Sequence, residues 1–289
     1  MRVLIVNPYA SGVNESLIAS VTAVLGEVEV RRTEHRGHGT ELAREARGGE
    51  ALYVLSGDGV FNEVLNGIDA ETPVGFLPGG GANVLTRALG LPRDPVRAAE
   101  RVVRGRTRRI SVGRVNGRRF GFAAGIGLDA EAVRRVDERG RSEELGRAGN
   151  FAFAWDLLRL VAERRGRFEP TLEISGHGRA AFVFVANADP YTYAGLVPLH
   201  FAPQARFELG LDLVAPKRVS PFSFPRLLGY VLLGRGQTRA SDVVYAHDLD
   251  RIEIHCDRPL PLQVDGEDLG DVIEAHFAAE RNAVQVLVP

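Results

Sequence analysis

Short apolar runs alternate with amphipathic stretches along the first third of the chain. The runs are apolar at consecutive positions, as in strands covered on both faces, and the stretches between them repeat apolar residues at helical spacing. Strands are expected at residues 3–6, 28–32, 52–55 and 74–77, and helices at residues 15–25, 40–46, 61–67, 84–89 and 95–103. This order predicts an α/β domain with a mainly parallel sheet, which binds ligands at the carboxyl ends of its strands.

The pattern changes after residue 107. Asn116 and Gly117 separate two β-rich runs, and both residue types tolerate the positive φ angles of a two-residue hairpin turn. A long amphipathic helix and further strands follow, which indicates a β-rich, antiparallel, sandwich-like α+β domain. Strands are expected at residues 108–115, 118–123, 171–174, 182–187, 251–256 and 284–288, and the helix at residues 145–165. We therefore expect domains at residues 1–107 and 108–289, with the terminal segment packing back on the first.

Composition narrows the range of functions. The formal net charge of −1 gives no electrostatic reason to expect nucleic acid as a partner. Lys217 is the only lysine, so cationic contacts with phosphate would come from arginine. Cys256 is the only cysteine and lacks the partners of a disulfide or a zinc motif, which favours a reducing, cytoplasmic location. No apolar run reaches the roughly 20 residues of a membrane-spanning helix, so we expect any membrane contact to be peripheral.

Three of the expected strand-to-helix turns suit phosphate binding. They are residues 7–12, 56–59 and 78–83, and each places glycine before a helix or within its first turn. The amides and dipole of a helix N-terminus attract anions, and glycine lets a phosphate approach the backbone. A single glycine turn is more often structural, but three at one sheet edge favour a site for nucleotide phosphates.

Asp58 lies between Gly57 and Gly59, where its carboxylate can face a bound phosphate. Two negative groups repel each other unless a cation bridges them, so this position implies Mg²⁺. Alternatively, Asp58 caps the helix that begins near Val60. The chain has no Walker-type Gly-Lys-Ser/Thr and no dinucleotide-binding glycine motif followed by an acid, which argues against a P-loop NTPase and a Rossmann dehydrogenase.

With these motifs the chain resembles the diacylglycerol kinase catalytic-domain family. This group of bacterial lipid kinases also includes sphingosine kinases and is more distantly related to NAD kinases. The resemblance covers nearly the whole chain, and its most specific part is a Gly-Asp-Gly with a trailing Asn-Glu combined with a late Asp-Gly-Glu. The motifs that carry it are Asn7-Pro8 with Ser11-Gly12, Thr33 with residues 37–43, residues 57–67, 77–83, 125–130 and 263–267, and a terminal strand that ends at Pro289.

The resemblance implies an NAD kinase-like first domain that binds ATP and a second domain that binds the lipid substrate. It implies that Glu267 is the general base, which accepts the proton of the lipid hydroxyl as that hydroxyl attacks the γ-phosphorus. Alternatively, residues 265–267 are an acidic hairpin turn. The residues implied in contact with ATP are Asn7, Ser11, Thr33, Gly57, Asp58, Gly59, Asn62, Glu63, Gly80, Gly81 and Asn83, of which Asp58 is also implied in catalysis through Mg²⁺.

Some positions depart from the family pattern. Val60 and Gly81 stand where the family usually has threonine, so two phosphate-binding hydroxyls are missing and we expect weakened or altered ATP contact. Ser111 stands where bacterial diacylglycerol kinases often have an acid. A serine at this position is similar to the sphingosine kinases. Some bacterial members bind a structural Mg²⁺ in a loop, and Glu208 and Asp212 could supply oxygens there.

Asp129 matches the acid that faces the lipid head group in sphingosine kinases, which implies contact with a hydroxyl or an amine of the lipid. The alternative is an N-cap of the helix that follows. Apolar stretches at residues 151–161 and 222–233 have arginines at their flanks. They could form an acyl-chain pocket or a surface that rests on a bilayer, or they could be ordinary core.

The leading hypothesis is a cytoplasmic, peripherally membrane-associated kinase that uses ATP and Mg²⁺ to phosphorylate a lipid hydroxyl. Diacylglycerol is the default substrate, and phosphatidic acid, a phospholipid precursor, would be the product. The alternatives are a sphingoid-type lipid kinase, a regulator that binds lipid or nucleotide with little or no catalysis, and an NAD kinase, which residues 62–67 and the late Asp-Gly-Glu fit poorly. The sequence leaves open whether the chain forms a homo-oligomer.

Overall fold

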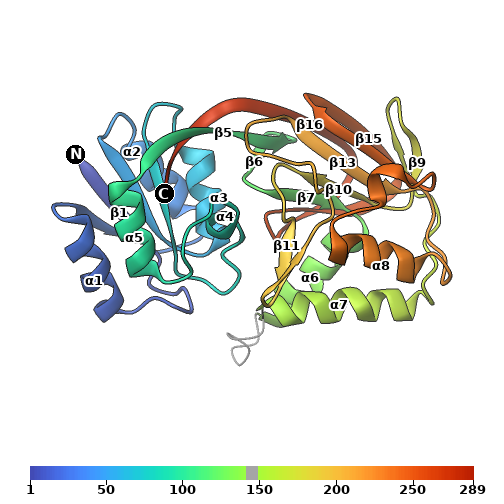
Figure 1. The fold of residues 1–289 in the computed structure, drawn as a ribbon, viewed down its shortest axis with the longest axis horizontal. Coiled ribbons are helices and arrows are strands. Elements are labelled where there is room, and N and C mark those ends of the chain that lie inside the picture. The colour runs from blue at the N-terminus through green and yellow to red at the C-terminus, as the bar shows by residue number, and fades with distance from the viewer. Residues whose placement is uncertain (141–148) are drawn as a thin grey trace. The chain divides into compact units, whose positions relative to one another are not determined.

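A computed structural model describes residues 1–140 and 149–289 of the chain. These residues form two compact units (Figure 1). Unit 1 comprises Met1–Val112 and Arg281–Pro289, and unit 2 comprises Gly113–Glu280. Two long strands, β5 (Arg106–Val115) and β16 (Glu267–Val288), contribute residues to both units.

Unit 1 is built on a parallel sheet with the strand order β2-β1-β3-β4. The end of β16 extends this sheet beyond β4, where Val286 pairs with Val74 in the parallel direction. The elements are β1 (Arg2–Val6), α1 (Glu15–Leu25), β2 (Glu29–Arg32), α2 (His38–Glu45), β3 (Ala51–Ser56), α3 (Asp58–Gly67), β4 (Val74–Pro78), α4 (Val84–Ala88) and α5 (Pro95–Arg104).

The central strands of unit 1 are buried along their whole length, as their consecutive apolar residues predict. Phe61 of α3 packs edge-to-face against Phe76 of β4, with 5.1 Å between the ring centroids. Asn14 begins α1 because its side chain accepts a hydrogen bond from the Leu17 amide at 2.9 Å. This packing brings the carboxyl ends of β1, β3 and β4 to one edge of the sheet.

Unit 2 is built on an antiparallel sheet with the strand order β14-β13-β10-β7-β15-β16. Its core includes Phe120, Ile126, Val185, Leu262 and Phe277. The elements are β6 (Arg118–Phe120), β7 (Ala123–Ile126), α6 (Leu128–Gly140), α7 (Gly149–Glu163), β8 (Leu172–Ile174), β9 (Gly178–Ala180), β10 (Val183–Ala186), β11 (Thr192–Ala194), β12 (Val197–Leu199), β13 (Leu211–Pro216), α8 (Phe224–Leu233), a short 3₁₀ helix (Gln237–Arg239), β14 (Val243–Leu249) and β15 (Arg251–Val264).

The expected fold class is confirmed, with a mainly parallel α/β unit and an antiparallel β-rich unit. Asn116 and Gly117 form the expected turn, with φ angles of 46° and 89°. The strand expected at residues 118–123 is instead two strands, β6 and β7. The strand is interrupted between them because the amides of Gly121 and Phe122 donate hydrogen bonds to the buried carboxylate of Asp265, at 2.6 and 2.9 Å, and so do not pair with a neighbouring strand.

Residues 145–148 of the helix expected at 145–165 lie outside the described residues, and the rest of it corresponds to α7. Among the helices that the structure describes, none is both long enough and apolar enough to cross a membrane.

Candidate active site

The turns that follow β1, β3 and β4 touch one another. The Gly12 amide donates a hydrogen bond to the Gly79 carbonyl oxygen at 3.0 Å. The Gly79 amide donates to the Ser56 carbonyl oxygen at 2.6 Å. The three turns therefore form one continuous stretch of backbone surface at the edge of the unit 1 sheet.

The glycines of these turns fall into two groups. A Cβ atom on Gly80 would lie 2.7 Å from the Cα atom of Gly57, so these two glycines are needed for contact between the turns themselves. A Cβ atom on Gly59 or Gly81 would meet no atom within 4 Å. Gly59 and Gly81 are therefore the positions at which a ligand can approach the backbone.

Two asparagines shape their own turns. Asn83 is left-handed, with φ 50°, and its side chain accepts a hydrogen bond from the Gly80 amide at 3.0 Å and donates one to the Gly80 carbonyl oxygen at 2.6 Å. The Oδ1 atom of Asn7 accepts from the Tyr9 amide at 2.9 Å. Ser11 is exposed in the first turn. Contact of these residues with ATP stays a prediction.

The carboxylate of Asp58 reaches from the first residue of α3 to the start of α4. Its oxygens accept hydrogen bonds from the amides of Val84, at 3.0 Å, and Leu85, at 3.1 Å. A carboxylate is favoured at a helix N-terminus by the helix dipole. Asp58 therefore caps α4, the helix after the one that its sequence position suggested. A role of Asp58 toward Mg²⁺ stays a prediction.

Glu63 of α3 holds the start of α2 in the same way. Its Oε1 accepts from the Gly37 amide at 2.7 Å and its Oε2 from the Gly39 amide at 2.9 Å. A Cβ atom on Gly39 would lie 2.7 Å from Glu63 Oε2 and 3.1 Å from Val60 Cγ1. Val60 is therefore a packing residue between α2 and α3, which accounts for an apolar side chain at this position.

The other two predicted ATP residues of unit 1 are buried. Asn62 is 1% exposed, and its Oδ1 accepts a hydrogen bond from Asn66 Nδ2 at 3.2 Å. Thr33 is 5% exposed and follows β2, where its amide donates to the Val6 carbonyl oxygen at 2.9 Å. Both side chains are buried, and their contact with ATP stays a prediction.

In unit 2, Asp265 and Gly266 form the hairpin turn between β15 and β16, and Glu267 is the first residue of β16. Asp265 and Gly266 have φ angles of 48° and 82°, and Val264 pairs with Glu267 across the turn. The buried carboxylate of Asp265 accepts hydrogen bonds from three consecutive amides, those of residues 121–123. The turn is therefore fixed to the connection between β6 and β7.

Glu267 follows this turn, and 18% of its side chain is exposed. Arg118 of β6 donates a hydrogen bond to its Oε2 at 2.9 Å. The guanidinium orients the carboxylate of Glu267 relative to the turn. The alternative expected from the sequence, an acidic hairpin turn, describes this backbone correctly, and the role of Glu267 as a base stays a prediction.

Asp129 lies in the first turn of α6 and is 2% exposed. Its Oδ2 accepts hydrogen bonds from the Tyr191 hydroxyl and from Gln263 Nε2, the latter at 2.9 Å. The Oε1 of Gln263 accepts in turn from the Gly266 amide at 2.9 Å. A chain of hydrogen bonds therefore runs from Asp129 to the turn that precedes Glu267.

The second carboxylate oxygen of Asp129, Oδ1, is buried and has no hydrogen-bond partner among the described residues. It lies against Gly125, where a Cβ atom would be 2.7 Å away. Burial raises the pKa of Asp129 to about 7, although the hydrogen bonds from Tyr191 and Gln263 lower it. An unsatisfied oxygen on such a group is a place where the hydroxyl of a substrate could donate a hydrogen bond.

Asp212, a candidate ligand of the structural metal, is fully buried in β13. It accepts a hydrogen bond from the Tyr245 hydroxyl at 2.8 Å, and its Oδ1 lies 2.7 Å from His247 Nδ1. Within the described residues, the one group of possible ligands close enough to hold an ion lies elsewhere, in unit 1, and consists of His35, His38 and Glu41. Metal binding by Glu208 and Asp212 stays a prediction.

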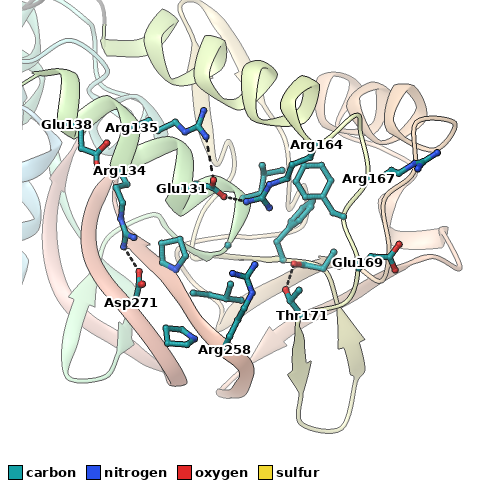
Figure 2. A pocket seen from close by; sticks show the side chains of 18 residues that line it. Glu131, Arg134, Arg135, Glu138, Arg164, Arg167, Glu169, Thr171, Arg258 and Asp271 are labelled. Atoms are coloured by element: carbon teal, nitrogen blue, oxygen red, sulfur yellow. Dashed lines mark hydrogen bonds and ion pairs between the residues drawn. The ribbon is translucent and has the colours of Figure 1, made fainter.

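A cavity of about 640 Å³ opens in unit 2 beside the start of α6, and Figure 2 shows its charged lining. Arg134 points to Asp271 and donates a hydrogen bond to it at 2.7 Å. Glu131 of α6 accepts from Arg164, which directly follows α7. Because these charges neutralise one another, the cavity offers no field of a single sign to a ligand.

Sequence reasoning missed several side chains around the unit 2 residues. Gln263 belongs to a motif that carries the resemblance, but no role was expected for it. Arg118 and Tyr191 lie outside every motif, and they are 149 residues from Glu267 and 62 residues from Asp129. Only the general need of a buried acid for donors could have suggested that such partners exist.

Two family models match the chain. The model of the diacylglycerol kinase catalytic domain matches residues 2–115, and the model of the YegS C-terminal NAD kinase beta sandwich-like domain matches residues 123–288. A diacylglycerol kinase of Bacillus subtilis (strain 168) is 27% identical over 271 residues, covering 91% of this chain and 86% of that protein. A diacylglycerol kinase of Staphylococcus aureus (strain JH9) is 28% identical over 279 residues, covering 91% and 82%.

Solved structures share the fold. A diacylglycerol kinase from Bacillus anthracis str. Sterne gives a TM-score of 0.72 at 20% identity, over 100% of this chain and 96% of that one. An NAD kinase from Archaeoglobus fulgidus in complex with ATP gives a TM-score of 0.51 at 13% identity, over 99% and 93%. These likenesses confirm the expected NAD kinase-like fold.

Gly80→Ala is expected to destabilise the protein, with Gly81→Ala as the matched control. An alanine Cβ at position 80 would lie 2.7 Å from the backbone of Gly57, so one of the turns must shift. Overpacking of this kind costs about 1–3 kcal/mol, whereas the open position 81 should tolerate a methyl group. Urea unfolding of both variants measures the difference, and equal free energies of unfolding would contradict the packing role of Gly80.

Asp129→Asn is expected to flatten the pH dependence of stability. Because the pKa of Asp129 rises from 3.8 to about 7 on folding, the folded protein keeps a proton that the unfolded chain has released between these values. Stability of the wild type should therefore fall as the pH rises from about 4 to about 7 and then level off. The variant lacks this titration, so its stability should change less over the same pH range. Parallel stability curves of the two proteins would contradict this.

Proposed function

The chain belongs to the diacylglycerol kinase catalytic-domain family of kinases, and we propose that it transfers the γ-phosphate of ATP to a hydroxyl of a lipid. Diacylglycerol is the proposed acceptor and phosphatidic acid the product, because the relatives from Bacillus subtilis and Staphylococcus aureus are diacylglycerol kinases. The observation that carries the proposal is a division of roles among the acids of the motifs.

Asp58, Glu63 and Asp265 each accept hydrogen bonds from backbone amides. Such a carboxylate stabilises the fold, because an amide buried without a hydrogen-bond acceptor would lower the stability of the protein. Glu267 is held differently, by the guanidinium of Arg118 at Oε2, and part of its side chain is exposed. This contact orients a carboxylate that is partly exposed. Glu267 is therefore the motif acid best suited to act as the general base.

On the donor side, Gly59 and Gly81 leave the backbone open to the phosphates of ATP. Gly59 lies in the first turn of α3, where amides without an intrahelical acceptor and the helix dipole favour an anion. Mg²⁺, when bound, would neutralise charge on the transferred phosphoryl group. Asp58 is its proposed ligand, a role in addition to its hydrogen bonds with the start of α4, and carboxylate oxygens are what Mg²⁺ prefers.

Asp129 is proposed to act on the acceptor side. Its buried Oδ1 could accept a hydrogen bond from the lipid hydroxyl once the residues that bury the carboxylate move aside. Through Gln263 and the Gly266 amide, Asp129 also supports the turn before Glu267. Asp129 is thus proposed first as a residue that positions the base, and second as a contact of the lipid.

A second candidate function is a regulator that binds lipid or nucleotide with little catalysis. Gly81 favours it, because the threonine usual at this position would supply a phosphate-binding hydroxyl. Val60 argues less for it, because its side chain packs against Gly39. A sphingoid-type lipid kinase and an NAD kinase are the remaining alternatives among enzymes.

A panel of acceptors with labelled ATP and Mg²⁺ tests the substrate. Diacylglycerol in detergent micelles is expected to receive more label than monoacylglycerol, ceramide, sphingosine, phosphatidylglycerol or NAD. Preferred transfer to sphingosine would assign the sphingoid type, and formation of NADP would assign an NAD kinase. No transfer to any acceptor, together with lipid binding by calorimetry, would replace the kinase proposal with that of a regulator.

Glu267→Gln is expected to lower kcat by about 100-fold or more, since glutamine keeps the shape of the side chain but cannot accept the proton. The affinity for ATP should stay unchanged. Glu274→Gln alters an exposed acid of the same strand and should leave both quantities unchanged. Wild-type turnover of Glu267→Gln, at unchanged ATP affinity, would exclude Glu267 as the base.

A further inference from the structure

The helix α8 of unit 2 turns apolar side chains to the outside. None of its residues is buried. Pro225, Leu228 and Leu232 recur at helical spacing on its exposed side, next to Leu233, and Phe222 just before the helix is 94% exposed. A surface helix normally presents polar residues to water and apolar residues to the core. The outward side of α8 departs from this rule.

Exposed apolar side chains also occur on elements that neighbour α8. α8 contacts β12, β12 pairs with β11, and β11 contacts α7, and Figure 1 shows these elements in the same part of unit 2. Eight of the thirteen exposed large apolar side chains in the described part of the chain lie on them or at their ends. These eight, which we call the apolar face, are Trp155, Leu158, Leu196, Val197, Phe222, Leu228, Leu232 and Leu233.

Positive charge accompanies the apolar face. Residues 213–241 contain five cations and no acid, in a chain whose net charge is −1. Arg218 and Arg226 form ion pairs with Glu169 and Asp242, which lie outside this segment. These two pairs neutralise part of the charge, so the excess of positive charge rests on the other three cations of the segment. Its five cations are Lys217, Arg218, Arg226, Arg235 and Arg239.

We propose that the apolar face is the surface with which this protein binds a bilayer that contains anionic phospholipids, an inference that rests on the proposed lipid kinase function. Apolar side chains of an interfacial helix enter the boundary between head groups and acyl chains, and arginine and lysine beside them bind lipid phosphates. Each contribution alone gives weak binding, and the apolar face together with the cations near it supplies both.

The distribution of charge argues against a second copy of the chain as the occupant. A two-fold symmetric dimer brings the same patch of both copies together. If α8 met its copy, Arg226 and Arg235, which lie on α8 and just after it, would come near the same residues of the other copy, and like charges oppose such an association. An anionic bilayer complements both the apolar residues and the cations.

Co-sedimentation of the full chain with vesicles tests this inference without ATP or turnover. Vesicles of phosphatidylcholine are compared with vesicles of equal parts phosphatidylcholine and phosphatidylglycerol, and the wild type is expected to prefer the anionic vesicles. The affinity of the double variant Phe222→Ser, Leu233→Ser for both kinds of vesicle should be lower than that of the wild type by at least about tenfold. Arg235→Gln with Arg239→Gln should reduce the preference for phosphatidylglycerol.

The control replaces exposed apolar side chains outside the apolar face. Ile273→Ser with Val103→Ser, which are 41% and 44% exposed, should bind vesicles like the wild type. Thermal unfolding checks that all variants are folded. Equal vesicle binding by Phe222→Ser, Leu233→Ser and the wild type would overturn the inference. A loss of dimers in light scattering with unchanged vesicle binding would overturn it too and assign the face to a second copy.

Failure here is distinguishable from failure of the proposed function. A wild type that phosphorylates a short-chain, water-soluble diacylglycerol but does not bind anionic vesicles would keep the kinase function and overturn the membrane inference. A wild type that binds vesicles through the apolar face but phosphorylates no lipid would keep the membrane inference and overturn the kinase function.

Discussion

A buried carboxylate needs hydrogen-bond donors, and Asp265 finds them in the three consecutive amides of residues 121–123. This one requirement interrupts what would otherwise be a continuous strand. It also fixes the turn between β15 and β16, and with it the positions of Gln263 and Glu267 on either side. Asp129 depends on the same turn, because Gln263 joins its carboxylate to the turn amide. Glu267 and Asp129 are thus both linked to the turn that Asp265 fixes.

Unit 1 uses the same device on its helices. Asp58 satisfies the first amides of α4, and Glu63 satisfies those at the start of α2. The glycines of the motifs allow these contacts, because Gly39 lies so close to Glu63 that a Cβ atom would clash with it. Acid and glycine therefore occur together in these motifs for a structural reason as well as a chemical one. The acid holds the backbone by accepting hydrogen bonds from its amides, and it can come this close because glycine has no side chain.

Periodicity predicted the elements of unit 1 closely, because each buried face requires apolar residues at the period of its helix or strand. The helix expected at residues 15–25 is α1 with the same bounds. The partners of polar side chains leave no such record, since a donor can lie anywhere in the chain. Asp58 finds its partner 26 residues away and Asp129 finds Tyr191 62 residues away. An acid beside glycines looks the same in sequence whether it holds a ligand or an amide.

The two missing threonines of the family pattern have different physical meanings. At Val60 the side chain fills space against Gly39, so the change belongs to the packing of α2 on α3. At Gly81 the space is open, so a hydroxyl is lost from the surface that a ligand would meet. Backbone amides at a helix start bind phosphate without such a hydroxyl, provided that the turn holds its shape. Asn83 supplies that rigidity through its two hydrogen bonds to Gly80. If ATP binds as proposed, its affinity depends on this turn more than on any side-chain hydroxyl.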